Sequence, residues 1–159
     1  MFGGDMVFGN HLDTADLKEV VSSAMANHLN IFDTAYAYGT GDSERIVGEL
    51  LGNYPREEVV ISDKFTPGMQ NDSSKNPVLD MLEGSLERFG IDFIDIYWIH
   101  NSADVEHWTP LLAKAVQSGK IGRVGVSNHS LEQVKRVQDI LASYGVKLSA
   151  VQNHFSLLY

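Results

Sequence analysis

The sequence predicts a parallel α/β fold of the barrel type, in a single domain over residues 1–159. Helical and extended segments alternate from residue 14 onward, and strands separated by helices form right-handed parallel crossovers. Each predicted strand ends at a polar residue, and the strand ends of a barrel converge on one mouth. The 159 residues suffice for one hydrophobic core. A complete eight-stranded barrel takes roughly 250 residues, so we expect only part of one.

Two helix–strand units are predicted in the first third of the chain. Asp13 or Thr14 can cap the first helix, whose apolar residues follow helical spacing at Leu17, Val20, Val21 and Ala24. Residues 30–33 form a short apolar strand that ends in a charge. A second helix is expected over 43–51, and a second strand over 59–64.

A third unit begins at Asn76, which caps a helix opened by Pro77 and closed by Gly90. The strand that follows covers residues 94–100.

The last two units follow the same order. A helix that ends at Gly119 precedes a strand over 123–127. Ser130 and Gln133 form a capping box that opens the next helix, and a fifth strand is expected over 150–155.

An open doubly wound sheet also satisfies this alternation, but it needs a glycine fingerprint directly after its first strand. The segment Gly39-Thr40-Gly41 comes several residues past Asp33 and has no third glycine in register. The barrel is therefore favoured, and its mouth would carry the polar residues that end the five strands: Asp33, Lys64, His100, Asn128 and Gln152.

Composition excludes several classes of function. Twelve Lys and Arg residues against 21 Asp and Glu give a net charge of −9, which disfavours nucleic-acid binding, because that requires a basic face. No apolar run approaches the roughly 20 residues of a membrane span. The absence of cysteine fits a reducing compartment, and no signal peptide is visible. We expect a cytoplasmic protein with no membrane partner.

The ionisable residues near the predicted mouth suit proton transfer to a carbonyl oxygen. Tyr38 has an ordinary pKa near 10, and a neighbouring ammonium such as Lys64 would favour its phenolate. Asp33 can hold the lysine, and His100 can orient the carbonyl. The amides of Asn128 and Gln152 suit a carboxamide such as that of nicotinamide.

Each residue also has an ordinary structural explanation. An aspartate after a strand commonly caps a turn, and a lone histidine is more often a hydrogen-bonded core residue. The functional interpretation depends on the whole set at successive strand ends. A metal site is not expected, because the histidines lack ligand spacing and Lys64 would repel a cation.

Four blocks of sequence follow one another along the chain. They contain Asp33-Thr34-Ala35 with Tyr38-Gly39, then Ser85-Leu86-Glu87-Arg88-Phe89-Gly90, Gly119-Lys120-Ile121-Gly122-Arg123, and Val151-Gln152. In this order the blocks resemble the aldo-keto reductases, and they look closest to the branch of bacterial general-stress reductases and potassium-channel β subunits. The match covers essentially the whole chain. The resemblance implies the (β/α)8 TIM-barrel type, with about strands 2–6 present.

The resemblance also implies an enzyme that reduces aldehydes or ketones, small-molecule carbonyl substrates, with NADPH. Tyr38 would be the general acid, Lys64 would tune it, Asp33 would pair with Lys64, and His100 would position the carbonyl. The nicotinamide carboxamide would be contacted by Ser127, Asn128 and Gln152.

The resemblance extends to only part of the family's barrel. Of the family's first strand only a tail around Phe2-Gly3-Gly4 would be present, and the segment with the phosphate-binding cations of NADP has no counterpart in this chain. We expect a truncated chain with poor or no activity alone, and a homo-oligomer formed through open sheet edges near Ile31 and Val151. The alternative is a non-catalytic half-barrel that acts as a self-associating or interaction module.

Overall fold

A computed structural model describes residues 14–158. It contains one sheet of five parallel strands in the order β1-β2-β3-β4-β5, which confirms the predicted parallel topology. The strands are β1 (Ile31–Asp33), β2 (Val60–Phe65), β3 (Ile94–Ile99), β4 (Ile121–Ser127) and β5 (Leu148–Gln152). The predicted cap at Asp13 and the predicted strand tail at Phe2-Gly3-Gly4 lie outside the described residues.

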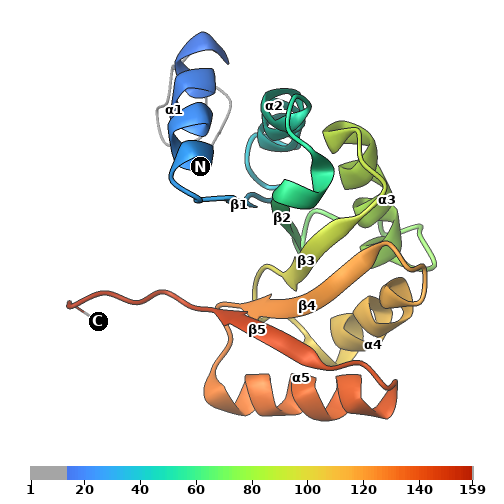
Figure 1. The fold of residues 1–159 in the computed structure, drawn as a ribbon. Helices are drawn as coiled ribbons and strands as arrows, with labels where there is room; N and C mark the ends of the chain where they lie inside the picture. The colour runs from blue at the N-terminus through green and yellow to red at the C-terminus, as the bar shows by residue number, and fades with distance from the viewer. Residues whose placement is uncertain (1–13, 159) are drawn as a thin grey trace.

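Helices alternate with the strands and line the outside of the curved sheet (Figure 1). They are α1 (Thr14–Ala26), α2 (Asp42–Leu51), α3 (Pro77–Phe89), α4 (Val105–Val116) and α5 (Leu131–Ser143), with a short 3-10 helix η1 (Arg56–Glu58) before β2. The core lies between these helices and the sheet, and it includes Val47, Leu82, Ile99, Leu112 and Leu141.

Local signals set the helix ends as the sequence predicts. The side chain of Asn76 accepts a hydrogen bond from the Leu79 amide, and Gly90 ends α3 with a φ of 70°. Ser130 and Gln133 form the predicted capping box at the start of α5. These interactions need only a few neighbouring residues, so they can be predicted from sequence.

The last strand ends earlier than the sequence predicted. We predicted extended structure over 150–155, but β5 runs from Leu148 to Gln152. Its only neighbour in the described sheet is β4, whose last residue, Ser127, pairs with Gln152. Beyond that point the described part of the sheet offers no strand to pair with, and Phe155 is 85% exposed.

Apolar side chains are also exposed at both ends of the sheet. Ile31 on β1 is 64% exposed and Val151 on β5 is 48% exposed. Parallel sheets normally have both faces and edges covered. Between residues 14 and 158, no helix is long and apolar enough to cross a membrane.

Candidate functional site

The strand register places the polar candidates on one side of the sheet. Lys64 pairs with Trp98, and Trp98 pairs with Gly125. Side chains alternate between the two faces of a strand, and paired residues share a face. Ser62 and Lys64 therefore lie on the face away from the helices, whereas Asp63 points toward them.

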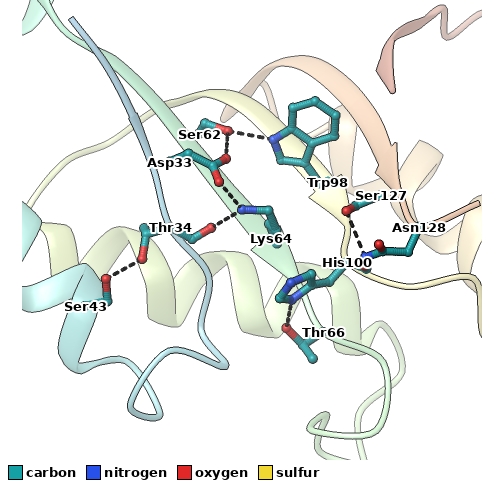
Figure 2. A network of polar contacts seen from close by, with 10 residues as sticks. All are labelled: Asp33, Thr34, Ser43, Ser62, Lys64, Thr66, Trp98, His100, Ser127 and Asn128. Atoms are coloured by element: carbon teal, nitrogen blue, oxygen red, sulfur yellow. Dashed lines mark hydrogen bonds and ion pairs between the residues drawn. The ribbon is translucent and has the colours of Figure 1, made fainter. Parts of the chain in front are cut away.

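Lys64 is held by the first strand of the sheet. Its Nζ lies 2.6 Å from Asp33 Oδ2 and donates to the carbonyl oxygen of Thr34 over 2.7 Å (Figure 2). The Lys64 side chain is 1% exposed, while that of Asp33 is 35% exposed. A buried ammonium needs such partners, and the predicted ion pair between Lys64 and Asp33 is confirmed.

Tyr38 lies in the loop between β1 and α2, next to this pair. Lys64 Nζ is 5.5 Å from the centre of the Tyr38 ring, and the His100 ring is 5.6 Å away, edge-on. We expected the ammonium to favour the phenolate, but the pKa of Tyr38 is raised above its ordinary value. Burial is the main cause, and the negative charges of Asp33 and Asp63 add to it. Tyr38 is therefore protonated at neutral pH, which is the state that a proton donor requires.

His100 follows β3, and its ring lies edge-on beside the ring of Tyr38. Its Nδ1 lies 3.0 Å from Thr66 Oγ1. The pKa of His100 is lowered, first by burial and then by the positive charge of Lys64, and the charge of Asp33 opposes this shift. The imidazole is therefore neutral near pH 7, with one N–H to donate.

Asn128 connects the end of β4 to His100. It has a φ of 60°, and its Nδ2 donates to the His100 carbonyl oxygen over 3.0 Å and to Ser127 Oγ over 3.1 Å (Figure 2). Gln152 pairs with Ser127 across β4 and β5. The ends of β4 and β5 thus carry neighbouring residues with hydroxyl and amide side chains, which are hydrogen-bond donors and acceptors.

Three polar residues of this network were missed by the sequence reasoning: Ser62, Thr66 and Trp98. Ser62 donates to Asp33 Oδ1 and accepts from Trp98 Nε1. A signal existed, because Ser62 stands two residues before Lys64 and therefore shares its face of β2. Among residues 14–158 there is no group of three or more His, Cys, Asp or Glu side chains that could hold a metal ion.

A second polar cluster lies on the helix side of the sheet. Glu44 and Asp63 are both fully buried there. Glu44 accepts hydrogen bonds from Ser85 and Arg88 on α3. This cluster connects α2 and α3 to β2, away from the mouth.

Comparison with known proteins gives one consistent result. A model of the aldo/keto reductase family matches residues 1–159. The aldo-keto reductase YhdN of Bacillus subtilis (strain 168) is 31% identical over 83% of this chain and 42% of its own length. The 6-dehydroglucose reductase of Novosphingobium aromaticivorans is 32% identical over 91% of this chain and 51% of its own length.

Solved structures agree in fold. An aldo/keto reductase from Klebsiella pneumoniae, crystallised with NADP and acetate, superposes with a TM-score of 0.66 and 29% identity, over 80% of this chain and 45% of that one. The five-stranded sheet thus matches part of a (β/α)8 barrel, as predicted. The chain spans about half the length of the curated relatives it matches.

Proposed function

The chain belongs to the aldo/keto reductase family, and on that premise we propose that it carries the proton-transfer site of an NAD(P)H-dependent carbonyl reductase. The observation that carries the proposal is the buried ammonium of Lys64, bonded to Asp33 and 5.5 Å from the ring centre of Tyr38. An uncommitted lysine would extend into solvent.

The proposed roles follow from the protonation states. Tyr38 is protonated, so its hydroxyl can transfer a proton to a carbonyl oxygen as the carbonyl becomes an alcohol. The phenolate that remains would lie beside the Lys64 ammonium, 5.5 Å from the ring centre, and a nearby opposite charge favours the charged form. If Thr66 donates to His100 Nδ1, the Nε2–H of the neutral ring is available to orient the carbonyl oxygen.

The family implies a nicotinamide cofactor, and the groups at the ends of β4 and β5 fit its carboxamide. When bound, NADPH supplies the hydride that reaches the carbonyl carbon. Ser127, Asn128 and Gln152 would hold the carboxamide. A few such hydrogen bonds contribute about 0.5–1.5 kcal/mol each, far below the roughly 8 kcal/mol of micromolar binding. We therefore expect no saturable NADPH fluorescence change at micromolar cofactor with residues 1–159 alone.

A chimera tests the proposed function. Residues 1–159 would replace the matching part of the Bacillus subtilis YhdN protein, and NADPH oxidation would be followed with a generic aldehyde. We expect aldehyde-dependent oxidation that falls by about 10²–10⁴-fold in Tyr38→Phe. Tyr36→Phe is the matched control, because Tyr36 lies against Arg88 and not at the mouth. A folded chimera that binds NADPH and reduces no aldehyde would refute the proposal.

A second function, self-association, is favoured by the exposed ends of the sheet. Ile31 and Val151 border the two edges of the described sheet, and Leu157 and Leu158 are almost fully exposed. Two copies could pair β1 of one with β5 of the other, since identical chains favour two-fold closure. We expect a dimer in sedimentation at micromolar concentration. A stable, soluble monomer would contradict self-association and leave the catalytic proposal standing.

A further inference from the structure

A continuous chain of hydrogen bonds leads from the interior of the curved sheet to the ion pair at its mouth. Trp98 Nε1 donates to Ser62 Oγ over 2.7 Å, and Ser62 Oγ donates to Asp33 Oδ1 over 2.6 Å (Figure 2). The second oxygen of the same carboxylate, Oδ2, is 2.6 Å from Lys64 Nζ. Three strands, β1, β2 and β3, therefore contribute to one network.

The direction of each hydrogen bond is determined by chemistry. An indole N–H can only donate, so it uses the acceptor capacity of the Ser62 hydroxyl. The single proton of Ser62 is then free to go to Asp33. With Oδ1 held by Ser62, the carboxylate presents Oδ2 to Lys64. Hydrogen bonds to a charged group are also stronger than neutral ones.

The position of the indole depends on a glycine. Gly125 is the register partner of Trp98 on β4, and a Cβ at residue 125 would overlap Cε3 and Cζ3 of the Trp98 ring. The absence of a side chain there lets the ring lie against β4. Both Trp98 and Ser62 are buried, so water does not readily replace either partner.

We propose that Trp98 is a positioning residue for carbonyl reduction, an inference that rests on the proposed function. Through Ser62 it fixes the orientation of the Asp33 carboxylate, and thereby the direction in which the Lys64 ammonium faces Tyr38. Trp98 touches no substrate in this scheme. Gly125 is needed because it provides the space for the ring.

Nuclear magnetic resonance of the 159-residue chain tests this inference. The Lys64 ammonium protons and the Trp98 indole proton would be followed by their exchange with water, with Lys64→Met used to assign the ammonium signal. We expect a protected Lys64 signal in the wild type. In Trp98→Phe, which keeps an aromatic ring and removes the N–H, exchange of the Lys64 protons should accelerate about tenfold.

Matched variants distinguish loss of the hydrogen bond between Trp98 and Ser62 from a general destabilisation of the chain. Trp108→Phe changes the chain's other tryptophan, which packs on Phe65, and it should leave Lys64 exchange unchanged. Ser62→Ala should reproduce the effect of Trp98→Phe and also accelerate exchange of the Trp98 indole proton, whereas Ser62→Thr should restore both.

Two results would overturn the inference: an unprotected Lys64 ammonium in the wild type, or equal exchange in the wild type and Trp98→Phe. These measurements need neither cofactor nor turnover. A chimera that fails to reduce aldehydes would therefore refute the proposed function while the exchange data still report on the network. Unchanged exchange beside a Tyr38-dependent activity would refute only the positioning role.

Discussion

Because of the carboxyl group of Asp63, we expect the free energy of unfolding of this chain to fall as the pH rises above the ordinary range of an aspartate. Asp63 is fully buried on the helix side of β2, and neither of its oxygens has a hydrogen-bond partner. The Ser85 hydroxyl beside it already donates to Glu44. Burial, reinforced by the negative charge of Glu44, raises the pKa of Asp63 well above its ordinary value, and the neighbouring Lys64 and Ser85 only partly oppose this shift. The folded chain therefore keeps a proton that the unfolded chain releases.

The sign and size of the effect follow from this difference. An aspartate in the unfolded chain has a pKa of about 3.9. Above that pH the unfolded state binds fewer protons, so the free energy of unfolding falls as pH rises toward the folded-state pKa. The slope for one group approaches about 1.4 kcal/mol per pH unit, so two units within this window remove about 2.7 kcal/mol.

Replacing Asp63 by Asn removes this dependence. We expect the unfolding free energy of Asp63→Asn minus that of the wild type to increase by up to about 1.4 kcal/mol per pH unit above pH 4. Urea unfolding followed by circular dichroism at several pH values measures it. The charged and titratable groups around Asp63 are Glu44 on α2, Arg88 on α3, Tyr97 on β3 and neighbouring Lys64. Because Glu44 interacts directly with Asp63, the difference reports on the two carboxyl groups as a pair.

An exposed carboxylate provides the control. Asp139→Asn on α5 removes a carboxylate that is exposed to solvent, and its difference from the wild type should stay nearly constant with pH. If the advantage of Asp63→Asn over the wild type does not widen between pH 4 and pH 6, the folded chain does not retain the Asp63 proton, and the reasoning is wrong.

Three further substitutions give distinct outcomes. Gly48→Ala should lower the free energy of unfolding by about 1–3 kcal/mol, because the added Cβ would lie 2.5 Å from the carbonyl oxygen of Phe89. A loss below about 0.5 kcal/mol in urea titration would contradict this. Ser130→Ala should cost about 1 kcal/mol through loss of the α5 capping box, measured in the same way, and an unchanged value would mean that the cap is not formed. Lys64→Met should change the unfolding free energy by less than about 2 kcal/mol, because an apolar side chain replaces a buried charge and the partly exposed Asp33 stays hydrated. It should still abolish aldehyde reduction in the chimera, and retained turnover would remove Lys64 from the mechanism.

Local chemistry was sufficient to predict much of this fold. Asn76, Gly90 and Ser130 act on backbone groups a few residues away, so their roles can be read from adjacent sequence. The alternation of strands and helices predicted a parallel sheet, because a crossover between parallel strands needs a helix-length connection. The ends of β1 and β2 predicted the pairing of Asp33 with Lys64, since parallel strand ends meet at one edge.

The sequence alone therefore predicted the order of elements and the edge of the sheet at which Asp33, Lys64 and His100 gather. The tertiary structure determined which side chains contact one another. The contact of Trp98 with Ser62 depends on a ring that lies over Gly125 on another strand, and the burial of Asp63 beside Glu44 depends on how α2 and α3 pack against β2. The pKa of Tyr38 rises for the same reason. Burial and Coulomb interactions depend on distances between residues remote in sequence, and only the packed chain fixes those distances.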